Sequence, residues 1–301
     1  PLTVAALGAD PPGKSVHFHL SLLSLIDGVA RPAEPTEEEV RHILSASERL
    51  NTKRLTVVPG AGCDHGLVWE NGSLDLGTTP AEEVCGHPVR SHLPQGDGER
   101  ILRRFIDDSV NLLSELELNR RRSGEGEPEV NLLWPWGHGF REPVANLTLR
   151  RGEVGWVLSD SLRMQGLARL AGYRHGNRLE LREGAALKEA GAFLRRHSTS
   201  ILSISGMAEL RKSGDLERIE HETRELDRGV FSRLDLDEES AIVLVSNGLA
   251  LVFDSKTPRD NTVPFDERAL EESALGTAEA WRLVDSVLSP EGKPGTIRSN
   301  A

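Results

Sequence analysis

The chain has 301 residues, of which 38% are hydrophobic and 28% charged, so it is long enough for two folded domains of ordinary size. Its formal net charge of -11 disfavours a nucleic-acid partner or an anionic membrane surface, because both attract proteins through positive charge. The two cysteines, Cys63 and Cys85, form no CxxC pair, which argues against a disulfide framework and a structural zinc site. No apolar run is long enough to span a bilayer and no export signal opens the sequence, so we expect a cytoplasmic protein.

The first half of the sequence alternates predicted strands with predicted helices. Apolar residues alternate over residues 15–28, which end in an Asp–Gly pair, and this pattern predicts a strand that enters a turn. Residues 36–50 begin with a threonine and three glutamates, as is typical of a capped helix N-terminus. Residues 54–72 indicate two strands joined by a glycine-rich turn, and residues 97–122 one long amphipathic helix. The small, acidic stretch 123–129 is the most linker-like of the chain.

The second half continues this alternation. Three short apolar strands are predicted at residues 130–137, 152–160 and 200–205. They are followed by a charged helix at 214–234, a further strand at 241–247, a last helix at 277–288 and a polar tail at 289–301. Strands that alternate with helices indicate an α/β fold with a largely parallel sheet.

Residues 8–15, GADPPGKS, match the phosphate-binding pattern GxxxxGK[ST], with Gly13, Lys14 and Ser15 as candidate nucleotide-binding residues. Such a loop requires a buried strand before it and a helix after it, so that backbone N–H groups and the helix dipole converge on the phosphates. The preceding LTVAAL could be that strand, but two prolines remove backbone donors from the loop and the following SVHFHL alternates like another strand. Nucleotide binding is therefore the second alternative, not the main hypothesis.

Two histidine-containing segments are further candidates. His17 and His19 lie on one face of a predicted strand, but no third ligand can be identified for a metal, so a polar sheet face is the favoured interpretation. The segment WPWGHG places Trp134, Trp136 and His138 around a proline and two glycines. A rigid aromatic wall followed by close backbone approach is typical of a site-forming loop, and an aromatic plug between domains fits the pattern equally well.

The segment NLLWPWGHG resembles the Asn-x-x-Trp-x-Trp-Gly-Gln-Gly segment of the archaeal-type, cofactor-independent phosphoglycerate mutases, a family of the alkaline phosphatase superfamily. The similarity continues through residues 151–173. Upstream, SVHFHLSLLSLIDG, DHGLVW and NRRR are similar to family segments, as are SGDLERIEHETRELDRGV and VPFDERALEESALG downstream. The resemblance covers most of the chain, from about residue 1 to residue 287.

The resemblance implies an alkaline-phosphatase-like α/β domain, with a largely parallel sheet and helices on both faces, that carries a smaller inserted α/β domain. We therefore expect a lead-in at residues 1–15, an inserted substrate-type domain at 16–127, a degenerate phosphatase-type domain at 128–288 and a flexible tail at 289–301. The family also implies two divalent metals, a phosphoserine intermediate and the interconversion of 3- and 2-phosphoglycerate.

The residues at the family's metal-ligand positions do not suit a metal. The family's N-terminal portion, with its first metal-binding Asp and its nucleophilic Ser, has no counterpart in this sequence, and five later ligand positions hold Ala208, Lys212, Gly248, Leu249 and Pro258. Aliphatic side chains, glycine and proline cannot ligate a divalent cation, and a lysine repels one unless it is deprotonated. We therefore expect no catalytic residue, no metal site and no cofactor in this chain.

Some polar positions of the family's inserted domain are retained. His65, Asn119 and Arg122 stand where the family has residues suited to a phosphate or a carboxylate, although Asp64 replaces an arginine there and would repel a phosphate. The candidate ligand-binding residues are therefore His65, Asn119, Arg122, Trp136 and His138.

These residues predict a non-catalytic homologue of the cofactor-independent phosphoglycerate mutases, a pseudoenzyme that acts as a binding or structural module. Its expected partners are a protein or a second copy of the chain, and a phosphorylated small acid is the candidate ligand. The first alternative is an active phosphoglycerate mutase or phosphohydrolase that depends on Mn or Mg and whose catalytic segment lies outside this chain.

Overall fold

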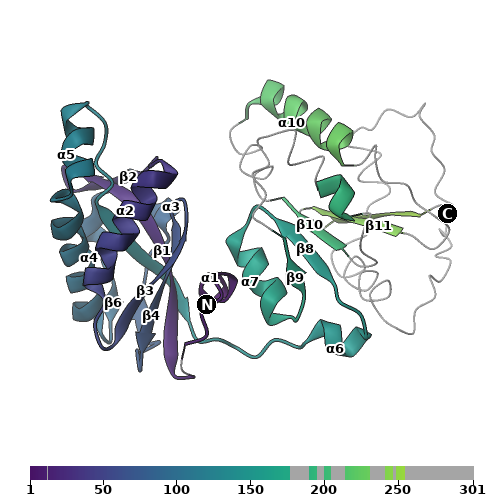
Figure 1. The fold of residues 1–301 in the computed structure, drawn as a ribbon, viewed down its shortest axis with the longest axis horizontal. Coiled ribbons are helices and arrows are strands. Elements are labelled where there is room, and N and C mark those ends of the chain that lie inside the picture. Colours follow the sequence, from purple (N-terminus) through teal and green to yellow (C-terminus); the bar gives the residue numbers. More distant parts are fainter. Residues whose placement is uncertain are drawn as a thin grey trace.

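The computed structural model describes residues 1–11, 13–176, 190–194, 200–204, 214–230, 241–246 and 249–254. These residues form two bodies that are joined by helix α1 and by the segment between β7 and α6 (Figure 1). The first body contains a five-stranded sheet in the order β2-β1-β4-β3, with β7 paired to the other side of β1. The strands are β1 (Ser15–Ile26), β2 (Val29–Pro32), β3 (Leu55–Ala61), β4 (Asp64–Glu70) and β7 (Leu132–Gly139).

Strand β1 lies at the centre of this sheet, and the strand that the alternation of its apolar residues predicts is confirmed. It turns into β2 at Asp27 and Gly28, whose φ angles of 50° and 78° favour short polar residues and glycine. Strands β3 and β4 also form the predicted hairpin. All the strand pairs in this sheet are antiparallel.

Helices cover one face of the sheet, on the left in Figure 1. Helix α2 (Glu37–Ser47) begins with the predicted cap: the side chains of Thr36 and Glu39 each accept a hydrogen bond from the other residue's backbone N–H. It packs with α4 (Glu99–Ser114) over the apolar side chains of β1 and β4, among them Phe18, Leu20 and Leu67. A short 3-10 helix, η1 (Glu48–Leu50), follows α2.

The predicted long helix over residues 97–122 is wrong in one respect, because it is interrupted. Helix α4 ends at Ser114, and α5 (Glu117–Gly124) begins after Leu116, whose backbone is extended. The side-chain amide of Asn119 donates to the carbonyl of Leu113 and so satisfies one of the open carbonyls at the end of α4. This contact lets the chain turn while Leu113 and Leu116 both stay in the core.

The opposite face of the sheet is covered by short elements. Helix α1 (Leu2–Ala6) packs against β1 and β4, while α3 (Ala81–Val84) and the 3-10 helix η2 (Val89–Ser91) cover Trp134 and Leu132. A separate two-stranded sheet of β5 (Leu76–Gly77) and β6 (Gln95–Gly96) contributes Leu76 to the core cluster that α4 covers. The possible strand in LTVAAL is therefore a helix.

The parallel strand pairs among the described residues lie in the second body. Strand β8 (Trp156–Ser159) pairs in parallel with β10 (Ser200–Ser203) and β9 (Arg174–His175). Around them lie α6 (Leu147–Arg151), α7 (Leu162–Leu170) and α10 (Leu216–Gly229), and β11 (Ala241–Ser246) pairs antiparallel with β12 (Leu249–Asp254).

The mixed α/β class is confirmed, but the described strands do not form the largely parallel sheet that the sequence predicts. Most of their pairs are antiparallel, and two of these, β1–β2 and β3–β4, are joined by tight turns, whereas a parallel pair needs a longer crossover. The predicted last helix at 277–288 and the tail at 289–301 lie outside the described residues, and the domain boundaries stay predictions. Among the described helices, none is long and apolar enough to cross a membrane.

Candidate functional site

A polar patch lies on the face of the sheet that α1 covers. In β1, His17, His19 and Ser21 alternate with apolar residues, and the register places Ser21 opposite Asp64 of β4 and His19 opposite Gly66. His17 and His19 are 3% and 9% exposed. The two imidazoles therefore share one face, as the sequence predicts, and α1 packs on that face.

A chain of polar contacts runs from α1 through His19 to β4. The Thr3 hydroxyl lies 2.8 Å from Nδ1 of His19, and Nε2 of His19 lies 3.2 Å from a carboxylate oxygen of Asp64. A hydroxyl, an imidazole and a carboxylate in this order are the groups of a nucleophilic triad. Thr3, however, is 2% exposed, so a substrate cannot reach its hydroxyl in this conformation. The arrangement fixes α1 to the sheet, and we call these three residues the α1 latch.

His17 lies beside the latch without a partner for one of its ring nitrogens. Among the described residues, none forms a hydrogen bond with its Nδ1, which is buried. Burial lowers the pKa of His17 from 6.5 to about 4, and the positive charge of Arg141 acts in the same direction. His17 is therefore neutral at physiological pH.

The two tryptophans of WPWGHG have different surroundings. Trp134 is fully buried and its indole N–H donates to the carbonyl of Thr79, 2.8 Å away. Trp136 donates to the hydroxyl of Ser21 at 2.9 Å, and its ring lies 4.8 Å from that of His19. Arg163 of α7 stacks over Trp136 at 5.8 Å. Both tryptophans thus belong to one buried cluster, and Trp136 in addition contacts α7 of the second body.

The other candidate histidines lie away from the latch. His65 alternates with Asp64, so its ring points to the helix-covered face, where Nδ1 accepts the Gly60 N–H at 3.0 Å and buried Nε2 has no partner among the described residues. Burial lowers the pKa of His65 to about 4. His138 stacks on Phe18 and bonds with the Thr78 hydroxyl at 3.1 Å.

Asn119 and Arg122 are both occupied by contacts within the protein. The Asn119 side chain bonds with the carbonyls of Leu113 and Val130 and with the N–H of Val130. Arg122 is 6% exposed and forms ion pairs with Glu39 at 3.0 Å and Glu127 at 3.3 Å. The positive charge that would attract a phosphate is therefore already neutralised.

Replacing Asn119 with alanine is expected to lower the free energy of unfolding by about 2–3 kcal/mol, because three backbone groups lose their partner inside the core. Asn111, exposed on α4, is the matched control, and Asn111→Ala should cost under about 0.5 kcal/mol. Urea unfolding followed by circular dichroism measures both. Equal midpoints for the two variants would contradict the structural role of Asn119.

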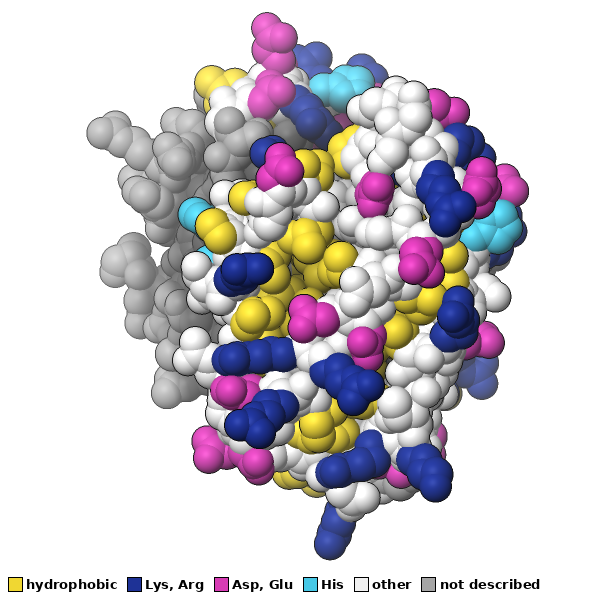
Figure 2. Space-filling model, turned by 90° about the vertical axis from the view of Figure 1, so that its left-hand side faces the viewer, with side chains coloured by type: hydrophobic (Ala, Val, Ile, Leu, Met, Phe, Trp, Pro, Cys, Tyr) yellow, Lys and Arg dark blue, Asp and Glu magenta, His cyan; other side chains and the backbone are white. Residues whose placement is uncertain are grey.

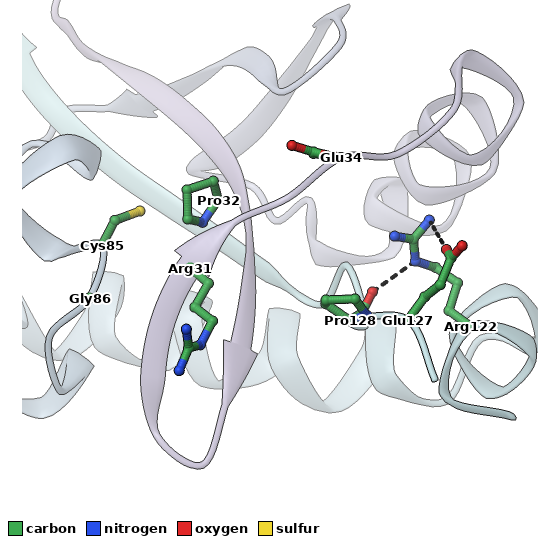
Figure 3. A pocket seen from close by; sticks show the side chains of 8 residues that line it. All are labelled: Arg31, Pro32, Glu34, Cys85, Gly86, Arg122, Glu127 and Pro128. Atoms are coloured by element: carbon green, nitrogen blue, oxygen red, sulfur yellow. Dashed lines mark hydrogen bonds and ion pairs between the residues drawn. The ribbon is translucent and has the colours of Figure 1, made fainter. Parts of the chain in front are cut away.

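Arg122 and Glu127 also border a hollow of about 760 Å³ between the β1–β2 hairpin and the end of α5 (Figure 3). Its lining combines two arginines and two glutamates with a thiol and small residues: Arg31, Pro32, Glu34, Cys85, Gly86, Arg122, Glu127 and Pro128. On the neighbouring helical side, apolar side chains gather in a hollowed band edged by charges of both signs (Figure 2). The charges in the lining balance, so it favours neither an anion nor a cation.

The loop that matches the phosphate-binding pattern lies between a helix and a strand in the reverse of the order that a phosphate loop requires. Gly13, Lys14 and Ser15 follow a helix, α1, and lead directly into a strand, β1. A helix N-terminus therefore does not point at this loop, and the dipole that would favour a phosphate is missing there. The geometry gives the nucleotide-binding alternative no support.

The positions that resemble metal-ligand positions lie mostly outside the described residues: Ala208, Lys212, Gly248 and Pro258. Leu249 is described, and it begins β12 opposite Ser246. Within the described ranges, no group of three His, Cys, Asp or Glu residues could hold a metal ion. That these positions hold no metal stays a prediction from the sequence.

The pairing of His19 with Asp64 is the part of this site that the sequence did not predict. Asp64 was expected only to repel a phosphate, yet it forms an ion pair with an imidazole on the neighbouring strand. The available signal was that both residues stand in predicted strands, but β1 and β4 are not consecutive in the chain, so no turn between them fixes their register.

Comparison with known proteins agrees with this fold. Residues 9–119 match the profile of the family 2,3-bisphosphoglycerate-independent phosphoglycerate mutase. A mutase of that name from Methanothermobacter thermautotrophicus is 23% identical over 97% of this chain and 80% of its own length. The chain is a homologue of the 2,3-bisphosphoglycerate-independent phosphoglycerate mutases. A probable mutase of this kind from Geobacter sulfurreducens is 28% identical, over 57% of this chain and 45% of the relative.

Solved structures show the same fold at low sequence identity. The cofactor-independent phosphoglycerate mutase from Thermoplasma acidophilum covers 95% of this chain, with a TM-score of 0.50 and 15% identity. A protein from Pyrococcus horikoshii covers 98% of this chain, with a TM-score of 0.65 and 17% identity. The chain spans less than half the length of the mutases from Geobacter sulfurreducens and Methanothrix thermoacetophila, 45% in each case.

Proposed function

We propose that this homologue is non-catalytic and acts as a binding or structural module, as one subunit of an assembly with a protein partner or a second copy of itself. A phosphorylated small acid is the small-molecule ligand that the family's chemistry suggests. Homology to these mutases does not by itself determine whether this chain is catalytic.

The first support comes from the residues at the family's ligand positions. Metal-dependent phosphoryl transfer needs oxygen or nitrogen ligands to hold the cations that neutralise the transferring group. Ala208, Gly248, Leu249 and Pro258 offer no such side-chain atom, and Lys212 carries a positive charge. Five changes of this kind together do not leave a two-metal centre.

The second support, and the observation that carries the proposal, is that three candidate polar side chains of the first body already bond with other groups of the protein. Arg122 is neutralised by Glu39 and Glu127, and Asn119 bonds with the backbone on both sides of the α4–α5 bend. His19 is held between Thr3 and Asp64 beneath α1. A site that releases such groups to a substrate would have to break these bonds first, which is costly for buried pairs.

Calorimetric titration of the chelator-stripped protein with Mn²⁺, with and without 3-phosphoglycerate, tests the proposal. We expect no saturable heat from Mn²⁺ alone and no conversion of 3- to 2-phosphoglycerate in the presence of Mn²⁺. Binding of about two ions per chain, or turnover above the rate without protein, would favour the active-enzyme alternative and reject the proposal. A heat signal from 3-phosphoglycerate alone, without metal, would identify the small acid as a ligand of a non-catalytic protein.

A further inference from the structure

The hollow beside Arg122 contains a hydrogen-bond donor that the fold leaves unused. The Nε of Arg122 donates to the Pro128 carbonyl at 2.8 Å, and Nη1 lies 3.0 Å from Glu39 and 3.3 Å from Glu127. Nη2 bonds with none of the described residues, although Arg122 as a whole is only 6% exposed. In Figure 3 this free amino nitrogen points into the hollow. A buried side chain with an open N–H group favours an acceptor that enters from this side.

Two further charges in the lining, of opposite sign, are unpaired among the described residues. Arg31 and Glu34 are both exposed and both line the hollow. They are three residues apart in the chain, and Figure 3 shows their side chains extending in different directions. Pro32 and Pro128 add apolar surface to the same lining. The hollow is therefore balanced in charge, but its positive and negative groups lie apart.

We propose that this hollow binds a zwitterionic α-amino acid with an apolar side chain. The ligand's carboxylate accepts from Nη2 of Arg122, and its ammonium group pairs with Glu34. Its side chain packs on Pro32 and Pro128. A volume of about 760 Å³ lies within the range of small-molecule pockets. The inference does not depend on whether the chain is catalytic.

The existing bonds of Arg122 explain why a zwitterion fits better than an anion. Glu39 and Glu127 already neutralise the guanidinium, so a phosphate would bring negative charge that the lining does not balance. A zwitterion adds no net charge, and it meets the free donor and the free carboxylate of Glu34 at the same time. The ion pairs of Arg122 stay intact when it binds.

Isothermal titration calorimetry of the full chain with L-leucine tests the proposal, because two analogues of leucine each lack one of its charges. 4-Methylpentanoate has no ammonium group, and 3-methylbutylamine has no carboxylate. We expect saturable heat from leucine. Each analogue should bind about tenfold more weakly, because each loses one charge-assisted hydrogen bond.

The variant Glu34→Gln removes the partner of the ammonium group at an exposed position, so the fold should be retained. It should bind leucine about tenfold more weakly than the wild type does, and leucine and 4-methylpentanoate should bind to it equally. Glu142→Gln changes an exposed glutamate outside the hollow and is the matched control, which should bind leucine like the wild type.

The thiol of Cys85 reports whether leucine occupies the hollow. Cys85 belongs to the lining, whereas Cys63 does not and donates to the carbonyl of Ala33. Leucine should slow the alkylation of Cys85 by iodoacetamide and leave that of Cys63 unchanged, as mass spectrometry of the digested protein measures. The proposal would be overturned by the absence of saturable heat from leucine, by equal affinity of the wild type for leucine and 4-methylpentanoate, or by an unchanged alkylation rate of Cys85.

Discussion

Replacing Glu39 with alanine is expected to lower the free energy of unfolding by about 3–5 kcal/mol, because the change leaves the guanidinium of Arg122 buried without its closest acidic partner. Glu39 is 5% exposed, and its two carboxylate oxygens bond with Arg121 and Arg122, each at 3.0 Å. It also accepts the Thr36 N–H at the start of α2. One carboxylate therefore joins the start of α2 to α5, and urea unfolding measures its contribution.

Matched variants separate the ion pair from the helix cap. Glu38→Ala, one position earlier and exposed, should cost under about 0.5 kcal/mol. Glu39→Gln keeps an acceptor for the Thr36 N–H and so should cost less than Glu39→Ala. The double variant Glu39→Gln, Arg122→Met should lose less stability than the sum of its two single variants, because each change removes the same buried pair. Additive losses would show that the pair does not contribute as a unit.

The same pair predicts how stability depends on pH. Burial by itself raises the pKa of Glu39, but the Thr36 N–H and Arg122 outweigh it and hold the pKa below its ordinary value. The folded state therefore binds this proton less tightly than the unfolded state, and the contribution is present above the ordinary pKa and lost as the pH falls through the folded pKa. The fall in stability between pH 6 and pH 3 should be shallower in Glu39→Gln than in the wild type.

The sequence predicted features that depend on neighbours along the chain. The alternation in residues 15–28 predicted β1 and its turn, and Thr36 with Glu39 predicted the cap of α2, because strand alternation and capping are local. Residues 2–6 could not be assigned from periodicity, since a short apolar run fits a strand and a helix equally well. The break after Ser114 depends on a side chain from the following helix, Asn119, and so left no local signal.

The contacts that define the site are not local. Arg122 meets Glu39 from 83 positions away, and His19 meets Asp64 only because the β1–β4 register brings Ser21 opposite Asp64. From the sequence, Arg122 and Asn119 were therefore assigned to a ligand, although within the fold their polar atoms bond with the protein itself. A family position identifies which residue stands at a site, but the surrounding contacts determine whether its polar atoms are available.

Replacing Trp134 with alanine is expected to lower the free energy of unfolding by about 3–5 kcal/mol, since it removes a fully buried indole and leaves a cavity. Trp134 packs with Leu23, Ala81 and Val84, and its N–H bond with Thr79 ties the segment before α3 to β7. Trp134→Phe keeps most of the apolar volume but leaves the Thr79 carbonyl without this donor, so it should cost about 1–2 kcal/mol.

Trp136→Phe is the matched comparison, because it also removes an indole N–H but from the junction with α7. Its loss should be about 1 kcal/mol, and hydrogen exchange should increase near His19 and α1 and stay unchanged over residues 79–92. Trp134→Phe should show the reverse pattern, with faster exchange over residues 79–92 alone. If both variants loosened the same residues, the two tryptophans would act as one unit, and the separation of a core tryptophan from a junction tryptophan would be wrong.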